Sequence, residues 1–190
     1  MPRFPAVVLA AGASTRMGRP KALVLLPDGA RALDRVIAAC REGGCDPVLV
    51  VTGSDAEAVG PAARAAGAVE VENPSWARGR STSVKAALPH LPPGAAGFLL
   101  HPVDHPLVEP AVVRALLAAA AEHPGARVVL PVHGGRRGHP AWFGAGVLPE
   151  IAVLGDDEPL HGIVRRGGVV EVPVASGSVL RNLDRPEDLP

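Results

Sequence analysis

The sequence predicts an α/β fold in which a mostly parallel sheet is covered by helices on both faces. The main observation is that short β-branched runs alternate with alanine-rich stretches of helical length. A second observation is that the 22 glycines and 21 prolines gather in the connections between these runs. The length of 190 residues suits one domain of ordinary size, so we expect residues 1–190 to form a single domain.

Six runs are predicted to be strands because they are rich in β-branched and apolar residues and are bounded by turn-forming residues. These runs are Ala6 to Ala10, Val48 to Thr52, Val69 to Glu72, Gly97 to Leu100, Val128 to Val132 and Val169 to Val174. Four stretches are predicted to be helices because apolar side chains recur in them at helical spacing. These stretches are Ala32 to Arg41, Ala56 to Ala66, Thr82 to Leu88 and Pro110 to Glu122.

The segment from Gly134 to Gly168 breaks the alternation of strands and helices. We expect it to be an insertion that lies over one end of the sheet. In an open α/β sheet, ligands bind outside the carboxyl ends of the strands. The loops that follow the predicted strands are therefore the places where chemistry is expected.

Composition excludes several classes of protein. Lysine plus arginine equals aspartate plus glutamate, at 19 each, so the chain lacks the overall basic field that would hold nucleic acid. The sequence has no apolar stretch near the roughly 20 residues of a membrane span. The apolar run Ala6 to Ala11 is too short for the core of a signal peptide. We therefore expect a cytoplasmic protein with neither a nucleic-acid nor a membrane partner.

The two cysteines, Cys40 and Cys45, are too few for a disulfide framework. Their spacing matches neither a zinc knuckle nor a CxxC redox pair. We interpret both as reduced packing residues.

The richest motif directly follows the first predicted strand. It reads Leu9-Ala10-Ala11-Gly12-Ala13-Ser14-Thr15-Arg16-Met17-Gly18-Arg19-Pro20-Lys21. Glycines and small side chains leave backbone N–H groups free to hold phosphate oxygens, and Arg16 and Lys21 add the positive charge that a triphosphate needs. The spacing is not that of a Walker A loop, and GxGxxG is absent. On spacing alone, an ordinary glycine-rich turn with two solvated cations is the alternative.

A carboxylate follows the fourth predicted strand, in His101-Pro102-Val103-Asp104-His105-Pro106. One or two carboxylates, together with substrate phosphates and water, are enough to hold Mg²⁺, so Asp104 is a candidate metal ligand. Alternatively, Asp104 caps the helix that begins near Pro110. His101 and His105 are four residues apart, but Pro102 and Pro106 prevent the helix that would make them a zinc-binding pair.

The pattern Leu-Ala-Ala-Gly-x-Ser-x-Arg-Met-Gly-x-x-Lys resembles the signature of the MobA-like nucleotidyltransferases, and within them that of the molybdenum cofactor cytidylyltransferases. The resemblance implies a Rossmann-like three-layer sandwich with a mostly parallel sheet, of the nucleotide-diphospho-sugar transferase type. It implies catalytic roles for Arg16, Lys21 and Asp104. Asp104 takes the place of the aspartate in the family's metal motif, although Val103 replaces the usual glycine there.

Three further segments resemble family motifs. Asn73 to Ser83 is similar to the segment that contacts base and sugar, with Trp76 interpreted mainly as a packing anchor. Gly138-His139-Pro140 resembles a motif that borders the acceptor site, which implies acceptor binding by His139. Leu154-Gly155-Asp156-Asp157 resembles another family motif, but Glu158 and Pro159 depart from it.

The chain end, Asn182-Leu183-Asp184-Arg185-Pro186-Glu187-Asp188-Leu189, is also similar to the family's ending. There the early acidic or Asn positions help to hold the metal, which implies that Asn182 and Asp184 join Asp104 as metal ligands. A simple helix cap at Asp184 is the alternative. Together these matches imply the following nucleotide-binding residues: Leu9, Ala10, Ala11, Gly12, Ser14, Arg16, Gly18, Lys21, Asn73, Gly79 and Ser83.

The residues and the resemblance together favour a Mg²⁺-dependent nucleotidyltransferase that releases pyrophosphate. The resemblance implies CTP as donor, molybdopterin or molybdenum cofactor as phosphorylated acceptor, and contact with a molybdoenzyme or its maturation chaperone. A guanylyltransferase or a sugar-phosphate nucleotidyltransferase is an alternative, because a fold does not fix a substrate. A maturation partner that binds nucleotide without catalysis is another.

Overall fold

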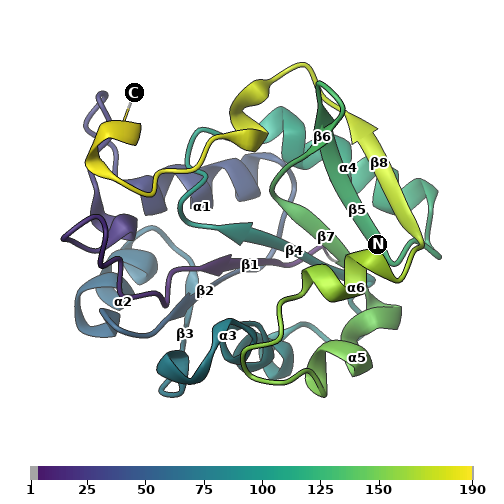
Figure 1. Cartoon of the computed structure of the whole chain (residues 1–190), viewed down its shortest axis with the longest axis horizontal. Coiled ribbons are helices and arrows are strands. Elements are labelled where there is room, and N and C mark those ends of the chain that lie inside the picture. Colours follow the sequence, from purple (N-terminus) through teal and green to yellow (C-terminus); the bar gives the residue numbers. More distant parts are fainter. Residues whose placement is uncertain (1–3, 190) are drawn as a thin grey trace.

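The computed structural model describes residues 4–189 and contains one eight-stranded, mostly parallel sheet between two layers of helices (Figure 1). The predicted three-layer α/β fold is therefore confirmed. The strands are β1 (Ala6–Leu9), β2 (Val48–Thr52), β3 (Val69–Glu72), β4 (Gly97–Pro102), β5 (Val128–His133), β6 (Arg136–Arg137), β7 (Ala141–Gly144) and β8 (Val169–Pro173).

Parallel pairing joins β3 to β2, β2 to β1 and β1 to β4. Leu9 of β1 lies opposite Pro102 of β4, so the loops that follow these two strands leave the same edge of the sheet. On the other side of β4, β7 pairs antiparallel with both β4 and β5, and β8 pairs parallel with β5.

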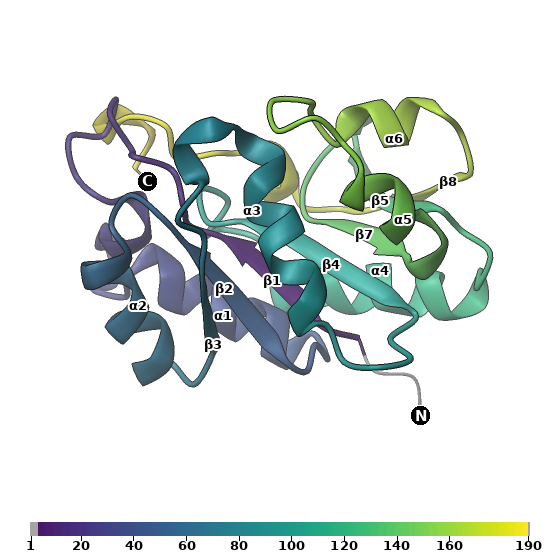
Figure 2. The same ribbon diagram turned by 90° about the horizontal axis from the view of Figure 1, so that it is seen from below.

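The helices are α1 (Ala32–Glu42), α2 (Ala56–Ala65), α3 (Arg80–Ala87), α4 (Pro110–Glu122), α5 (Leu148–Ala152) and α6 (His161–Arg165). Helices α1, α2 and α4 pack on one face of the sheet, and α3, α5 and α6 pack on the other (Figure 2). The strands supply both cores because alternate side chains point to opposite faces, as Val50 and Val51 of β2 do. None of the helices in the described part of the chain has the length and apolarity needed to cross a membrane.

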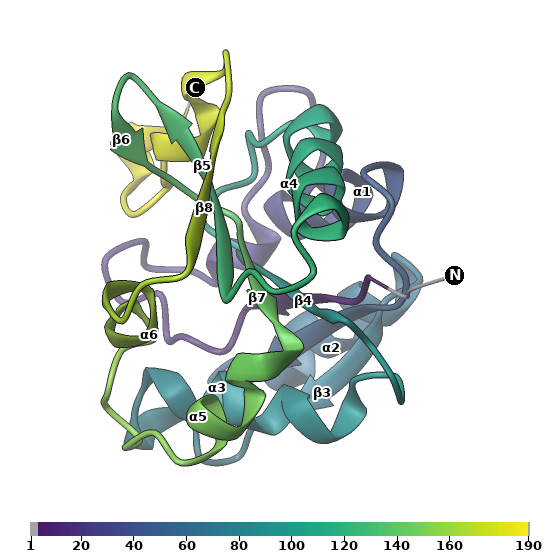
Figure 3. The same cartoon turned by 90° about the vertical axis from the view of Figure 1, so that its right-hand side faces the viewer.

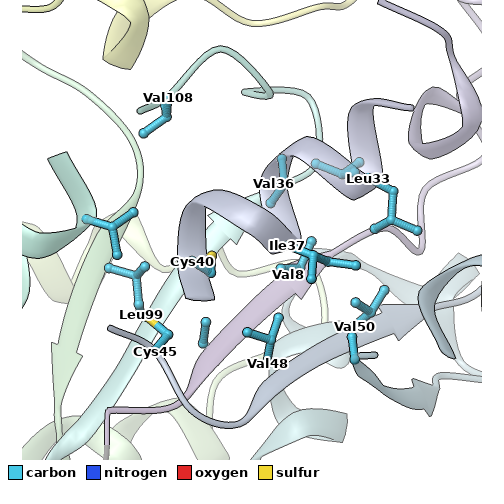
Figure 4. Packing of buried hydrophobic residues seen from close by; sticks show 14 of the residues in the cluster. Val8, Leu33, Val36, Ile37, Cys40, Cys45, Val48, Val50, Leu99 and Val108 are labelled. Carbon is cyan, nitrogen blue, oxygen red and sulfur yellow. The ribbon is translucent and has the colours of Figure 1, made fainter. Parts of the chain in front are cut away.

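The predicted apolar stripe of α1 lies on the sheet (Figure 4). Leu33, Val36 and Ile37 are almost completely buried there. Cys40 and Cys45 are free thiols buried in the same core, which confirms their interpretation as packing residues.

The prediction that residues 134–168 form an insertion over one end of the sheet is wrong. Strand β7 lies inside the sheet, between β4 and β5 (Figure 3). Its side chains Ala141, Trp142 and Phe143 are all buried, so the strand shows no alternation of polar and apolar residues. A strand of four residues, with three apolar side chains between Pro140 and Gly144, is too short for periodicity to identify. The segment also contains β6, which pairs with β5, and helices α5 and α6, which cover the α3 face.

Candidate functional site

A cavity of about 820 Å³ opens at the edge of the sheet where β1 and β4 end. Its size is typical of small-molecule sites. Among the predicted site residues, those that line it are Leu9, Ala10, Ala11, Gly12, Ser14, Arg16, Lys21, Gly79, Ser83, Asp104, His139, Asn182 and Asp184.

The loop after β1 forms the part of the cavity best suited to phosphate. The backbone N–H groups of Ala11, Gly12 and Ala13 donate to no acceptor within residues 4–189. Ser14 has a φ of +48°, and its hydroxyl accepts a 3.0 Å hydrogen bond from the Lys21 amide. The loop therefore closes on itself through Ser14 and leaves its first amides available to an anion, as in other backbone nests.

Asp104 enters the cavity because β4 is hydrogen-bonded to β1. The amide of Val103 donates to the carbonyl of Leu9 at 3.1 Å, which continues the pairing of the two strands beyond their ends. Asp104 is the next residue, so its carboxylate lies beside the loop that follows β1. A single register between two parallel strands thus brings together two motifs that are about 90 residues apart in the sequence.

The C-terminal segment returns to the same place and supplies a second carboxylate. Leu183 donates from its amide to the carbonyl of Asp104 at 2.7 Å. The Leu183 side chain is buried with Met17, Val24 and Leu26 in a small cluster separate from the two main cores. In Figure 1 the yellow end of the chain can be followed to the purple loop after β1. This packing sets Asp184 next to the loop.

Lys21, at the start of the 3₁₀ turn Lys21–Leu23, connects the two carboxylates. Its ammonium nitrogen Nζ lies 3.6 Å from Asp104 Oδ2 and forms a close ion pair with Asp184. Arg16 Nη1 lies 3.2 Å from Asp184 Oδ2, and Asn182 Nδ2 donates to the same oxygen at 3.0 Å. The hydrogen bond from Lys21 lowers the pKa of Asp184, which is therefore ionised at neutral pH.

The two carboxylates fit a divalent cation. Oxygen Oδ1 of Asp104 is buried and has no hydrogen-bond partner within the described residues. A buried carboxylate oxygen without a donor is costly unless a cation or water satisfies it. Residues 4–189 contain no cluster of three or more His, Cys, Asp or Glu side chains placed to hold a metal. A site of two carboxylates, completed by phosphate and water, is the kind that Mg²⁺ and similar hard cations use.

Two histidines, His105 and His139, lie beside Asp104, and a third, His101, lies close to both of them. The rings of His105 and His139 stack with their centroids 4.7 Å apart. Loss of hydration lowers the pKa of His105 to about 4 and also lowers that of His139. Both rings are therefore neutral at neutral pH, so His139 can offer hydrogen bonds to a ligand but no positive charge. Burial lowers the pKa of His101, which is fully buried, to about 3.

Two of the predicted nucleotide-binding residues, Asn73 and Gly18, do not line the cavity. Asn73 is buried, and its amide nitrogen donates to the hydroxyls of Thr82 and Ser83 at 2.9 and 3.0 Å. It therefore orients Ser83, which does line the cavity. Gly18 lies in a turn with a φ of +68°, where glycine is favoured, and shapes the loop from outside the cavity.

Comparisons with known proteins identify the family of this chain. Residues 6–172 match the family described as the MobA-like NTP transferase domain. The chain belongs to this family.

Relatives of this MobA-like domain carry different names. The molybdenum cofactor cytidylyltransferase of Escherichia coli K12 is 26% identical over 189 residues, covering 99% of this chain and 94% of that protein. The nicotine blue oxidoreductase of Paenarthrobacter nicotinovorans is 34% identical over 82% of this chain and 79% of that protein. A bifunctional IPC transferase and DIPP synthase of Rubrobacter xylanophilus is 37% identical over 67% of this chain and 30% of that protein. The match therefore spans less than a third of that relative's length. Membership of the family therefore leaves the substrates open.

Solved structures share the whole fold of the MobA-like domain. Rv0371c of Mycobacterium tuberculosis H37Rv aligns with a TM-score of 0.83 at 32% identity, over 98% of this chain and 95% of that chain. A second structure of Rv0371c, a complex with manganese, aligns over the same fractions with a TM-score of 0.77 at 30% identity.

Several lining residues of this MobA-like domain were not predicted as site residues from the sequence. They include Asp55, Arg80, His105, Asp157 and His161, together with apolar neighbours such as Leu160. Helix α3 begins at Arg80, two residues before its predicted start, which places this arginine at the cavity. For Asp157, the signal was the motif from Leu154 to Asp157, which Glu158 and Pro159 had weakened.

Proposed function

We propose that this MobA-like domain is a cytidylyltransferase that transfers CMP from CTP to a phosphorylated acceptor and releases pyrophosphate. The observation that carries the proposal is the arrangement of Lys21 between Asp104 and Asp184, beside a loop with free backbone amides. This arrangement offers anion-binding donors and cation-binding carboxylates within one cavity. Both are needed by a reaction between two phosphate groups.

In the proposed reaction, a phosphate oxygen of the acceptor attacks the α-phosphorus of the nucleotide. The bond between the α-phosphorus and the bridging oxygen breaks, and pyrophosphate leaves with that oxygen. The amides of residues 11–13 hold phosphate oxygens, while Lys21 and Arg16 neutralise the charge that develops on them. The Arg16 side chain is 66% exposed, so it can turn from Asp184 towards a triphosphate at the cavity mouth.

Asp104 and Asp184 are the residues that would hold Mg²⁺. When bound, the ion would draw charge from the phosphate oxygens and lower their repulsion. Asn182, the third predicted metal ligand, would act on the ion through Asp184, which it orients by its hydrogen bond to Oδ2. The manganese in the Rv0371c structure supports the use of a divalent cation in such a domain.

The preference for CTP over GTP rests on the wall near Ala11. Ala11 is only 5% exposed, lines the cavity and packs in the core that contains Trp76 at its edge. Gly53 lies between them, since a Cβ there would come within 2.7 Å of Trp76 Cβ and 2.8 Å of Ala11 Cβ. We infer that this packed wall leaves room for a pyrimidine better than for a purine. Shape of this kind contributes about 1–3 kcal/mol to discrimination.

Molybdopterin, with or without bound metal, is the proposed acceptor. The support is the sequence motifs and the relative named molybdenum cofactor cytidylyltransferase, which matches this chain over almost its full length. His139 lines the cavity as a neutral ring that can hydrogen-bond the acceptor. A molybdoenzyme or its maturation chaperone would then receive the product.

The experiment is a matrix of nucleoside triphosphates against acceptors, with pyrophosphate release as the readout. The expected result is Mg²⁺-dependent release that needs both CTP and molybdopterin, with a lower kcat/KM for GTP. The variant Ala11→Gly should reduce the ratio of kcat/KM for CTP to kcat/KM for GTP. A wild-type preference for GTP would refute the donor assignment, and an unchanged preference in Ala11→Gly would refute the steric reason for it.

A further inference from the structure

One wall of the cavity comes from the segment between α5 and α6. Asp157, Pro159, Leu160 and His161 all line the cavity, and we call the segment Asp157 to His161 the far wall. The loop after β1 and the two carboxylates account for the phosphate groups of a nucleotide. The far wall is not needed for these phosphate groups, so it is available to contact a second substrate.

Asp156, the residue before the far wall, is tied to α3 by two cations. Lys85 Nζ donates to Asp156 Oδ1 at 2.7 Å, and Arg78 Nη2 lies 2.8 Å from Oδ2. Lys85 also donates to the carbonyl of Leu154 at 2.9 Å. The hydrogen bond from Lys85 and the charge of Arg78 lower the pKa of Asp156, which keeps its carboxylate ionised.

The backbone of the same segment is also fixed to the start of α3. The Ser81 amide donates to the Asp156 carbonyl at 3.1 Å, and the Ser81 hydroxyl donates to the carbonyl of Glu158. Gly79 has a φ of +146°, and a Cβ there would collide with the Asp156 carbonyl and the Asp157 carboxylate. The far wall therefore packs directly on the helix start that also carries Ser83.

We propose that Asp156 is a positioning residue that holds the far wall against α3 so that the wall binds the second substrate. This inference rests on the proposed nucleotidyl transfer. Asp156, Lys85 and Arg78 do not themselves line the cavity, so they act on a ligand only through the far wall. The wall offers the Asp157 carboxylate, the His161 ring and the apolar surface of Leu160. These groups fit a substrate that carries hydroxyl or N–H donors beside an apolar face.

The test compares Asp156→Ala with the wild-type chain and with Asp34→Ala. Asp34 is a matched control because Arg31 holds its carboxylate through two hydrogen bonds and neither residue lines this cavity. Lys85→Met breaks the same contact from the α3 side and serves if Asp156→Ala folds poorly. The measurements are hydrogen exchange of residues 154–161 and steady-state kinetics with each substrate varied in turn.

The expected result for Asp156→Ala is faster exchange in residues 154–161 and a rise of about tenfold in the acceptor KM. The nucleotide KM and kcat should stay within about twofold, a split that general destabilisation would not produce. Unchanged exchange, or a nucleotide KM that rises as much as the acceptor KM, would overturn the proposal. If the wild-type chain transfers nucleotide to no acceptor, the proposed function fails, and the exchange data alone then decide whether Asp156 holds the wall.

Discussion

The amide of Leu183 donates a 2.7 Å hydrogen bond to the backbone carbonyl of Asp104. This bond joins the end of the chain to the residue that follows β4, and it sets Asp184 beside Lys21. The buried Leu183 side chain holds the arrangement in place through Met17 and Leu26. The second carboxylate of the site therefore depends on a small hydrophobic cluster as well as on the hydrogen bond to the residue that follows β4.

Leu183→Ala tests this dependence. We expect kcat to fall by about tenfold or more, because a loosened Asp184 leaves the catalytic geometry imprecise. The circular dichroism of the sheet and helices should persist, since Leu183 belongs to neither main core. Leu25, which is 58% exposed, provides the control Leu25→Ala. Equal activity of the two variants would contradict the proposed role of the cluster.

Lys21→Ala and Arg16→Ala should each reduce kcat/KM by about 10²-fold or more, because both cations meet the charge of the triphosphate in a partly dry cavity. Lys21→Ala should also slightly lower the free energy of unfolding measured without Mg²⁺, because Asp104 and Asp184 lose the ammonium group that they share. Kinetics with the nucleotide varied provide the measurement. Arg35→Ala is the control, because Arg35 pairs with Asp28 away from the cavity. Small, equal effects of all three substitutions would show that the loop after β1 is an ordinary turn without a role in binding the triphosphate.

Buried His101 predicts a specific pH dependence of stability. Burial lowers its pKa from 6.5 to about 3, so the unfolded chain takes up a proton below about pH 6.5 while the folded chain does not. The free energy of unfolding should therefore fall as the pH falls from about 6.5 towards 3, by at most about 1.4 kcal/mol per pH unit for this side chain. His105, whose pKa is lowered to about 4, acts in the same direction.

Urea unfolding of the wild-type chain and of His101→Gln, at several pH values in this window, measures the effect. The variant should show a shallower dependence of the unfolding free energy on pH, whatever its absolute stability. His90→Gln, at an exposed histidine, should leave the dependence unchanged. A wild-type slope retained in His101→Gln would show that other groups control the acid sensitivity.

Much of the fold follows from local sequence patterns. All six predicted strands and four predicted helices are present, because alternating and helical apolar spacings reflect which face each element buries. Strand β7 was missed because it is buried on both faces and too short to show a period. Its place between β4 and β5 depends on pairing with strands that are distant in the sequence, which local patterns do not predict.

The site was less accessible from sequence than the fold. The motifs placed Lys21 and Asp104 in loops after strands, and the register of β1 with β4 brings those loops together. The role of Asn73 depends on two hydroxyl partners in α3, which the sequence alone does not identify. The contact between Leu183 and Met17 joins residues that are 166 positions apart, and no local sequence pattern predicts such a contact.

We propose that the cavity transfers a nucleotidyl group to a phosphate and that Asp104 is essential to this step. The most direct measurement follows CTP labelled at its α-phosphorus, with Mg²⁺ and molybdopterin, in the wild-type chain and in Asp104→Ala. We expect label in the acceptor product and one pyrophosphate released for each label transferred. Both should be lost in an Asp104→Ala variant whose circular dichroism is unchanged. Asp104 is half-buried at the end of a strand and fills no core, so the variant should fold. Transfer at a near-normal rate in Asp104→Ala, or no labelled acceptor from CTP and the wild-type chain, would contradict this proposal.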